Sequence, residues 1–410
     1  CSVSDQQAWV RGYMDDRYYW YNQQGTPDPN AADMNDYVRS LRYVGDRFSG
    51  AQPEADFKEL FEEGVRLGWG YSLSFADEAG TDLRFRIVEP LSPLGLAGVQ
   101  RGHRVVSING LSAQQIATQG LPGVVAAGQT RTFVVQDSVG QQSTLSVASA
   151  VFKLSPVLRS SVLSLGTRTV AYLAYNEFIS SGNSAVQAAF DQFTAQSATD
   201  LVLDLRYNAG GSVAVARDIA SRIAGAARDG SVFAEARFNA KKSAENGSIR
   251  LNAGALPGTS LNGLSRVVVI TSRATASASE LVVNGLRPFM DVVLIGDTTT
   301  GKPYGSQVRS ACEVAYSILN IEYFNALGQG GYANGIPATC NVPDDLSLPF
   351  GDVQEGRLQA ALSYLQTGAC PAVAKVNDAM LGMNAKKANT KTTITNQILG
   401  ESSPPAAVLD

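Results

Sequence analysis

Three polar segments carry the residue types that could do chemistry in this 410-residue chain. The first, Asp204–Ser212, follows an apolar run and contains the paired glycines Gly210 and Gly211. Two glycines at a helix entry allow close backbone approach and leave N–H groups that can bind an oxyanion or a phosphate. The segment lacks the Gly-Lys-Ser/Thr element of a phosphate-binding P-loop. A plain tight turn explains the same pattern, so this segment alone assigns no function.

The second segment, Ser272–Glu280, places serines at the start of a predicted helix. Ser277 and Ser279 both suit a helix N-cap, where the side-chain oxygen accepts a backbone hydrogen bond. The positive end of a helix also stabilises negative charge that develops on an attacking oxygen. Capping and nucleophilic attack are therefore both open roles for Ser277.

The third segment, Gly296–Gln307, contains Lys302. A loop lysine is ordinarily a solvated charge, and it becomes a base near neutral pH only where burial lowers its pKa. The single histidine of the chain, His103, lies far from all three segments in the sequence. A hydrolase built on these segments therefore needs a lysine base, because a Ser-His-Asp triad would depend on that one distant residue.

Alternating strands and helices surround the three segments. This order predicts a layered α/β domain with a largely parallel sheet. Active residues of such sheets gather in loops beyond the carboxyl ends of the strands, which is where all three segments are expected. The predicted strands are Thr169–Tyr175, Asp200–Leu205, Arg266–Thr271 and Val292–Ile295, and the predicted helices are Ser184–Phe193, Val213–Ile223 and Ser277–Leu286.

Taken in order, the three segments resemble those of the carboxy-terminal processing peptidases, also called tail-specific proteases. That family carries a D-L-R-x-N-x-G-G turn, an A-S-A-S-E helix start and a T-x-G-K loop. The matching positions here are Asp204–Gly211, Ala276–Glu280 and Thr299–Lys302, with the lysine 25 positions after the first serine. The resemblance implies a crotonase- or ClpP-like α/β domain and a serine endopeptidase that cleaves protein or peptide substrates near their C-termini.

The resemblance also implies roles for single residues. Ser277 becomes the nucleophile and Lys302 the base, while Glu280 is left as a structural anion in the first helical turn. The family often has a glutamine four positions after the lysine. Here position 306 is serine, so Gln307, one position later, is the candidate for orienting the lysine.

The expected oxyanion donors are backbone N–H groups at Gly210 or Gly211 and at Ala278. Ala209 stands where the family commonly has proline, which softens the turn but keeps both glycines. The implied reaction requires no metal and no organic cofactor.

Short alternating strands broken by glycine turns run from about Leu67 to Val147. The run Ser92–Gly110, which ends in an Asn-Gly turn signal, makes this segment resemble a PDZ domain, predicted over residues 65–150. In that family a Gly-x-Gly-hydrophobic loop presents N–H groups to the terminal carboxylate of a peptide. A purely structural small barrel is the alternative. The matching peptide-binding positions are Gly68, Trp69, Gly70 and Tyr71.

The rest of the chain completes a multidomain α/β organisation. Residues 1–64 are predicted to form a helical cap, with Asn30 or Asp33 capping its second helix. Residues 151–371 form the predicted peptidase domain. Residues 372–410 form a predicted tail with little to bury.

Four cysteines, at positions 1, 312, 340 and 370, bear on the compartment. Because the chain begins with Cys1 rather than methionine, we expect that an upstream segment was removed. Cys1 then either carries lipid or belongs to an exported protein with two disulfides, the alternative being four unpaired cytosolic thiols. Cys312 and Cys340 flank a predicted strand, loop and strand and are the first expected pair, which leaves Cys1 for Cys370. The expected location is the periplasm or cell envelope, with or without a lipid anchor.

Composition excludes several function classes. The net charge of −4 argues against a nucleic-acid partner, and no apolar run approaches the ~20 residues that cross a bilayer. No cysteine–histidine cluster suggests zinc. Two non-catalytic readings stay open: an apolar-ligand-binding module of the kind found in retinoid-binding repeats, which have related folds, and a peptide-binding scaffold.

Overall fold

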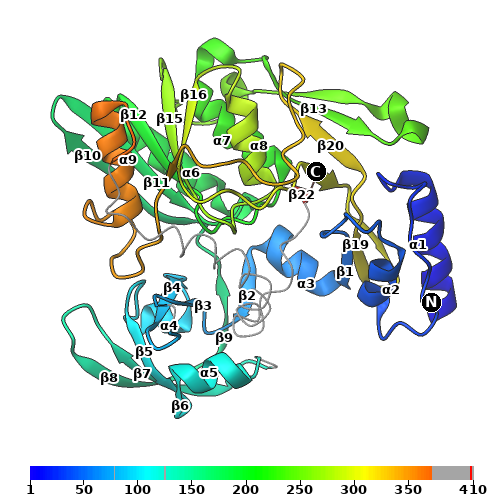
Figure 1. Ribbon diagram of the computed structural model, residues 1–410, viewed down its shortest axis with the longest axis horizontal. Helices are drawn as coiled ribbons and strands as arrows, with labels where there is room; N and C mark the ends of the chain where they lie inside the picture. Colours follow the sequence, from blue (N-terminus) through cyan, green and yellow to red (C-terminus); the bar gives the residue numbers. More distant parts are fainter. Residues whose placement is uncertain (78, 124–125, 372–406, 409–410) are drawn as a thin grey trace. The chain divides into compact units, whose positions relative to one another are not determined.

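The computed structural model describes residues 1–77, 79–123, 126–371 and 407–408 (Figure 1). The chain divides into two compact units. The first contains Cys1–Gly64 and Ser160–Thr339, and the second contains Val65–Arg159 and the segment that starts at Cys340. The helical cap and the α/β body, which were expected as separate segments, therefore share one unit. The predicted tail lies outside the described residues except at positions 407–408.

A parallel sheet forms the centre of the first unit. Its strands follow the order β10-β11-β12-β15-β16, and the pairs from β11 to β16 are parallel. Figure 1 shows helices α6, α7 and α8 beside these strands. All the predicted strands and helices of the α/β body are present. Their bounds are β10 Val157–Leu165, β11 Arg168–Tyr175, α6 Asn183–Ala195, β12 Asp200–Asp204, α7 Val213–Ala224, β15 Arg266–Thr271, α8 Ala278–Leu286 and β16 Asp291–Gly296.

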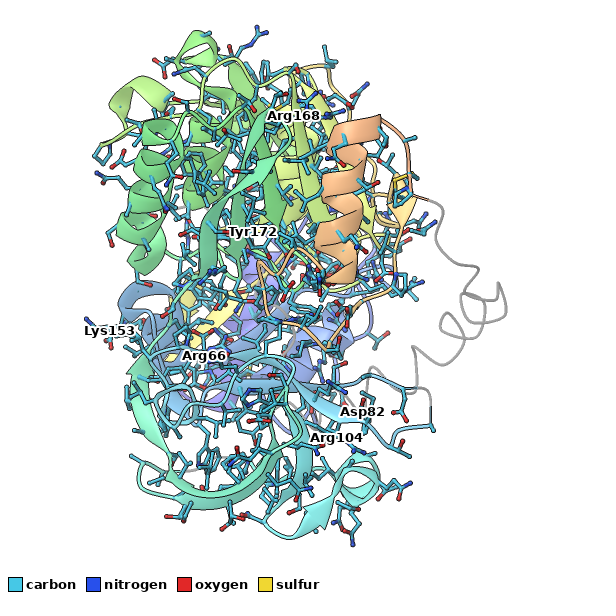
Figure 2. All side chains as sticks on the ribbon, turned by 90° about the vertical axis from the view of Figure 1, so that its left-hand side faces the viewer. Arg66, Asp82, Arg104, Lys153, Arg168 and Tyr172 are labelled. Carbon is cyan, nitrogen blue, oxygen red and sulfur yellow. A yellow bond between two sulfur atoms is a disulfide. The ribbon has the colours of Figure 1, made fainter. Side chains whose placement is uncertain are left out.

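The central strands are apolar because both of their faces are covered. Every residue of β12 is buried, as is every residue of β15 after Arg266. Continuous apolar runs of this kind are typical of parallel strands between two layers. One polar pair joins two of these strands: Tyr172, labelled on β11 in Figure 2, donates its hydroxyl proton to Asp204 at 2.8 Å.

A second sheet of the first unit follows the order β14-β13-β20-β17-β22. The pairs from β14 to β17 are antiparallel, and β17 pairs in parallel with β22. Short 3-10 helices connect parts of this region. The bounds are η2 Ser180–Gly182, η3 Ala226–Arg228, β13 Val232–Phe238, η4 Ala240–Glu245, β14 Gly247–Arg250, η5 Ala253–Ala255, β17 Tyr304–Ser306, β20 Ile321–Phe324 and β22 Ala407–Val408.

The helical cap packs on a small three-stranded sheet with the order β1-β19-β18. Asp33 caps α2, as one of the two predictions had it: its carboxylate accepts the N–H of Asp36 at 2.8 Å. Aromatic and aliphatic side chains of the cap share a buried core with Tyr316 on β19. The bounds are α1 Val3–Arg17, α2 Met34–Leu41, β1 Gly50–Pro53, α3 Glu54–Lys58, the π-helix η1 Glu59–Glu63, β18 Arg309–Ala311 and β19 Val314–Ser317.

The second unit is built on an antiparallel sheet with the order β3-β4-β5-β7-β8, and β6 pairs with β5. The predicted Asn109-Gly110 turn is confirmed, because both residues have positive φ between β5 and β6. The resemblance of this unit to a PDZ domain stays a prediction. The bounds are β2 Val65–Gly68, β3 Tyr71–Phe75, β4 Leu83–Val88, α4 Pro93–Leu96, β5 Arg104–Ile108, β6 Leu111–Ser112, α5 Ala113–Gln119, β7 Thr130–Gln136, β8 Gln142–Ala148, β9 Ala150–Lys153, β21 Cys340–Asn341 and α9 Gly356–Thr367.

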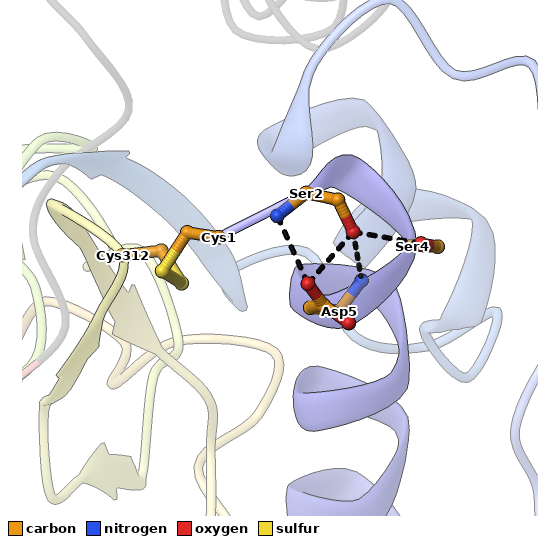
Figure 3. The surroundings of a disulfide bond; sticks show 5 residues. All are labelled: Cys1, Ser2, Ser4, Asp5 and Cys312. Atoms are coloured by element: carbon orange, nitrogen blue, oxygen red, sulfur yellow. Dashed lines mark hydrogen bonds between the residues drawn. A yellow bond between two sulfur atoms is a disulfide. The ribbon is translucent and has the colours of Figure 1, made fainter.

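The disulfides correct the predicted pairing. Cys1 bonds Cys312, with 5.7 Å between their Cα atoms (Figure 3), and Cys340 bonds Cys370, with 5.5 Å. Cys312 lies in the turn between β18 and β19, where it and Glu313 both have positive φ. Neither residue is a glycine or an asparagine, so the sequence carries no signal for this hairpin. A Cys1 sulfur in this bond has no thiol left to carry lipid.

No helix in the described part of the chain is both long enough and apolar enough to cross a bilayer.

The disulfide pairing can be tested by mass spectrometry of the unreduced protein. Digestion after glutamate, with cleavage at Glu280, Glu313 and Glu355 among other sites, separates the four cysteines into different peptides. We expect one linked pair containing Cys1 and Cys312 and another containing Cys340 and Cys370. A peptide pair joining Cys312 to Cys340 would contradict the structure. Reduction should lower the free energy of unfolding by about 2–5 kcal/mol for each bond.

Candidate active site

The three polar segments lie together at the carboxyl ends of the adjacent parallel strands β12, β15 and β16. Backbone hydrogen bonds join them directly. Ala276 donates its N–H to the Asn208 carbonyl at 3.1 Å, and Thr300 donates to the Thr275 carbonyl at 2.9 Å. The middle segment is therefore held on both sides, and residues far apart in the sequence meet at one edge of the sheet.

Ser277 occupies a strained turn between β15 and α8. Its φ is 59° and its ψ is −117°, a conformation that a non-glycine residue adopts only where the surroundings enforce it. The residue is buried, and its Oγ has no hydrogen-bond partner in the described part of the protein. Ser277 therefore does not use its hydroxyl as a cap. Ser279 is different, because its Oγ donates to the Asn208 carbonyl at 2.9 Å.

The glycine turn is packed against Ser277. A Cβ atom on Gly210 would lie 2.7 Å from the Ser277 Cβ, and on Gly211 it would lie 2.3 Å from the Phe178 carbonyl oxygen. Both glycines also have positive φ, at 114° and 133°. Any side chain at either position would push the turn away from the serine, so the sequence requires glycine at both.

The possible oxyanion donors are not equivalent. The Gly210 N–H donates to the Asn208 side-chain oxygen at 2.9 Å, so this predicted donor is already occupied. Ala278 is the first residue of α8, and N–H groups in a first turn have no intrahelical acceptor. Gly211 and Ala278 are therefore the better candidates for binding an oxyanion beside Ser277.

The Glu280 carboxylate connects the serine turn to the lysine loop. Its Oε2 accepts the N–H of Ser277 and the N–H of Lys302, both at 2.8 Å. Its Oε1 accepts the Gly301 N–H at 2.7 Å and the Thr299 hydroxyl at 2.5 Å. Burial raises the pKa of Glu280, while all four donors favour its ionised form. One oxygen thus holds the two candidate catalytic residues by their backbones.

Lys302 is buried, with 1% of its surface exposed. Burial lowers the pKa of Lys302 to about 7, and the negative charges of Asp46 and Glu280 oppose that shift. A lysine with this pKa is partly neutral at neutral pH and can accept a proton. The Lys302 amine makes no hydrogen bond to the Ser277 Oγ, since that oxygen has no partner. Such contacts often form only when substrate is bound.

The prediction for Gln307 was wrong. Its side-chain oxygen accepts from Asn320 at 3.3 Å and from Arg17 at 3.5 Å. The backbone N–H of Gln307 also binds the Asn320 side chain, at 3.1 Å. This residue follows the last residue of β17, and its side chain belongs to that neighbourhood rather than to Lys302. Ser306, at the position of the family glutamine, is fully buried.

Sequence reasoning missed two residues that affect the lysine amine. The Phe48 ring centroid lies 5.1 Å from the Lys302 Nζ, and the negative charge of Asp46 raises the pKa of Lys302 against the effect of burial. Both come from the end of the cap, more than 250 positions before Lys302. No spacing or motif links the two segments, so only the fold reveals this contact. Among the described residues, no cluster of histidine, cysteine, aspartate or glutamate could hold a metal ion.

Family models match both parts of the first unit. The model of peptidase family S41 matches residues 169–339, and the model of the peptidase S41 N-terminal domain matches residues 5–50. Together these segments cover more than half of the chain. The chain belongs to peptidase family S41. The resemblance inferred from the three polar segments is thereby confirmed.

Curated relatives of this S41 chain are named as carboxyl-terminal-processing peptidases. The chain is 23% identical over 277 residues to carboxyl-terminal-processing peptidase 1 of Arabidopsis thaliana, which covers 64% of this chain and 52% of the relative. It is 25% identical over 226 residues to a carboxyl-terminal-processing protease of Synechocystis, covering 53% and 49%. The chain thus spans about half the length of the curated relatives it matches.

Solved structures show the same mixed α/β, multidomain fold. The crystal structure of an S41 protease from Bacteroides fragilis matches with a TM-score of 0.71 and 26% identity, over 88% of this chain and 97% of that one. A photosystem II D1 C-terminal processing protease matches with a TM-score of 0.51 and 19% identity over the same shares. The second likeness concerns the fold alone.

Lys302→Met tests the buried lysine without an activity assay. The pKa of Lys302 is about 7 in the folded protein against an ordinary 10.5, so the unfolded chain binds more protons between these values. Wild-type stability therefore rises with pH across this window relative to the variant, by on the order of a few kcal/mol. Denaturant unfolding of both proteins at about pH 6 and about pH 10 measures the difference.

Lys153→Met is the matched control, because Lys153 on β9 is exposed (Figure 2). The difference in free energy of unfolding between Lys153→Met and the wild type should be the same at both pH values. If the difference in free energy of unfolding between Lys302→Met and the wild type is equally independent of pH, the lowered pKa of a buried Lys302 is contradicted.

Proposed function

We propose that this chain is a serine endopeptidase that cleaves protein or peptide substrates near their C-termini. Ser277 is the nucleophile and Lys302 is its general base. The N–H groups of Gly211 and Ala278 bind the oxyanion. The reaction needs no metal and no organic cofactor. Membership of family S41 and the names of the curated relatives support this assignment.

The proposed reaction has two halves. Neutral Lys302 takes the proton from the Ser277 hydroxyl as its oxygen attacks the peptide carbonyl, and the tetrahedral oxyanion is held by the two N–H groups. The intermediate collapses, and the leaving amine takes the proton from Lys302. Lys302 then removes a proton from water, which attacks the acyl-enzyme, and the proton returns to the Ser277 oxygen.

Two observations together carry this proposal. The buried Ser277 hydroxyl has no hydrogen-bond partner among the described residues, and burial lowers the pKa of Lys302 in the neighbouring loop to about 7. A buried hydroxyl without a partner costs stability, and so does a buried lysine. The backbone N–H groups of both residues bind the same Glu280 oxygen, so their positions are coupled. Destabilising features that gather at one place in a fold are typical of an active site, because the chemistry requires them.

The non-catalytic alternatives account for less of this geometry. A module that binds apolar ligands or peptides needs neither a strained serine nor a lysine with a pKa near 7. Either group would be more stable as an apolar residue of similar volume. A binding function alone therefore leaves both features unexplained.

We also propose that the second unit binds the substrate C-terminus through the loop of Gly68, Trp69, Gly70 and Tyr71. The side chains of Trp69 and Tyr71 belong to the core of the unit, so the loop would contact a peptide through its backbone. The Arg131 guanidinium lies 3.8 Å from the Trp69 ring and donates to the Tyr71 hydroxyl at 2.6 Å. This buried positive charge favours a carboxylate nearby.

The proposed location is outside the reducing cytoplasm, in the periplasm or cell envelope. Two disulfides support this proposal, because such bonds persist mainly in oxidising compartments.

Ser277→Ala tests the peptidase assignment. We expect cleavage of a peptide library, followed by mass spectrometry, to fall by roughly 10³-fold or more. Ser184→Ala, an exposed serine on α6, is the matched control and should cleave like the wild type. Thermal unfolding checks that both variants fold. Undiminished cleavage by Ser277→Ala would refute the assignment, and a folded wild type that cleaves no peptide would favour a binding module.

Peptides that differ only at their C-terminus test the second unit. Measured by fluorescence anisotropy on the full-length Ser277→Ala protein, an amidated peptide should bind about tenfold more weakly than the free acid. Gly70→Ala should remove this preference, because its Cβ would lie 2.0 Å from the Ser92 Cβ. Gly98→Ala is the control, since that glycine also has positive φ but open space around it. Equal binding of acid and amide would count against a carboxylate site.

A further inference from the structure

The loop after β20 has no role in the reaction proposed above, although it contacts both elements that carry the catalytic residues. It comprises Asn325–Ile336 and contains four glycines, of which Gly328, Gly331 and Gly335 have positive φ. Its tip is exposed, with 67% of Leu327 accessible to solvent. We call this segment the β20 loop.

We propose that Thr299 is a positioning residue, whose hydroxyl links the β20 loop to the catalytic pair through Glu280. This inference rests on the proposed function, because it concerns how Ser277 and Lys302 are held for that reaction. Thr299 acts only through the Glu280 carboxylate, to which its hydroxyl is bound.

The first end of the β20 loop is held by α8, the helix that begins directly after Ser277. Asn325 is fully buried, and its side-chain amide donates to the Asn284 carbonyl at 3.2 Å. The Asn284 side chain on α8 donates in turn to the Gln329 carbonyl at 2.9 Å. Buried amides are stable only where they are hydrogen-bonded, so this network fixes the loop against the helix.

The other end of the β20 loop is held by the lysine loop. Thr299 donates its N–H to the Ile336 carbonyl at 3.1 Å. The two backbones also touch: a Cβ atom on Gly335 would lie 2.3 Å from the Thr299 carbonyl oxygen. A Cβ atom on Gly301 would lie 2.4 Å from the Ala333 carbonyl oxygen. Because no space separates the backbones, a shift of one loop requires a shift of the other.

The Thr299 hydroxyl joins this contact to the catalytic pair. It is buried, it accepts the Ile336 N–H at 2.7 Å, and it donates its proton to the Glu280 Oε1 at 2.5 Å. A hydroxyl has one proton, which rotates to suit the groups around its oxygen. The Ile336 N–H occupies a lone pair and leaves the proton directed at Glu280. Since Glu280 also binds the backbone N–H groups of Ser277 and Lys302, hydrogen bonds run from the loop to both residues.

A packing role and a positioning role for Thr299 predict different outcomes. Packing requires only the volume of the side chain, whereas positioning requires its hydroxyl. Valine fills nearly the same volume without the hydroxyl. After that change, Glu280 still has the three N–H donors of Ser277, Gly301 and Lys302, so its buried carboxylate stays hydrogen-bonded. The fold should therefore remain, while the bond between Glu280 and the residue that contacts the β20 loop is lost.

Thr299→Val and Thr299→Ser separate these roles in steady-state cleavage of a peptide that the wild type cuts. Thr299→Val should lower kcat roughly ten- to hundredfold, because small misplacements of reacting groups have effects of that size. Its KM should change by less than about twofold, since the change removes no substrate contact. Thr299→Ser keeps the hydroxyl and should retain kcat within about threefold. A folded Thr299→Val protein with the wild-type kcat would overturn the inference, and so would equal losses of kcat in both variants.

Gly335→Ala tests the share of the β20 loop in the same assay. Its Cβ would push the loop away from the Thr299 carbonyl oxygen, so kcat should fall by about tenfold or more. Gly331→Ala is the matched control, because this glycine of the same loop also has positive φ but has nothing within 4 Å of its Cβ. Its kcat should stay within about twofold of the wild type. If Thr299→Val does not fold, this pair decides: equal kcat in the two alanine variants would overturn the inference.

The design separates this inference from the proposed function. If the wild type and Ser277→Ala cleave equally, the peptidase assignment fails, and with it the catalytic pair that Thr299 would position. If Ser277→Ala is inactive and a folded Thr299→Val keeps the wild-type kcat, the assignment stands and the role of Thr299 fails.

Discussion

The geometry of this site depends on one carboxylate, that of Glu280. Its two oxygens accept N–H groups from Ser277, Gly301 and Lys302 and the hydroxyl of Thr299. The donors come from two loops that follow different strands, so the carboxylate determines how far apart those loops lie. Because hydrogen bonds to an ion are short and strong, they also offset the cost of burying it. Without this anion, the backbones of the serine and the lysine would lose the one hydrogen-bond acceptor that they share.

The same site contains features that lower the stability of the folded chain, and the rest of the fold must offset them. Ser277 has a left-handed backbone, its hydroxyl is unpartnered, and the Lys302 amine is buried. Each of these features destabilises the folded chain. The parallel sheet beneath them compensates, because its strands are covered on both faces and packed with aliphatic side chains. The reactive groups can therefore be held in unfavourable states without the site relaxing.

Sequence patterns anticipated the parts of the molecule that local chemistry determines. The α/β elements followed from apolar runs, and the paired glycines followed from a turn that no side chain can enter. The pairing of Cys312 failed, because it depends on a hairpin without glycine or asparagine. Gln307 failed for a similar reason: whether its side chain turns toward Lys302 or Asn320 is set by packing around β17. Contacts of the cap with the lysine cross more than 250 positions, which no local pattern can encode.

That long-range contact makes the cap part of the site rather than an accessory to it. A lysine with a pKa near 7 exists only while water is kept from its amine, and the Phe48 ring forms part of the wall that does so. The cap is attached to the body by the β1–β19 strand pair, by the shared aromatic core and by the Cys1–Cys312 disulfide. Any opening of the cap would hydrate Lys302 and restore its charge. These three attachments therefore act on the lysine as well as on stability, since they determine how much of the time the base is neutral.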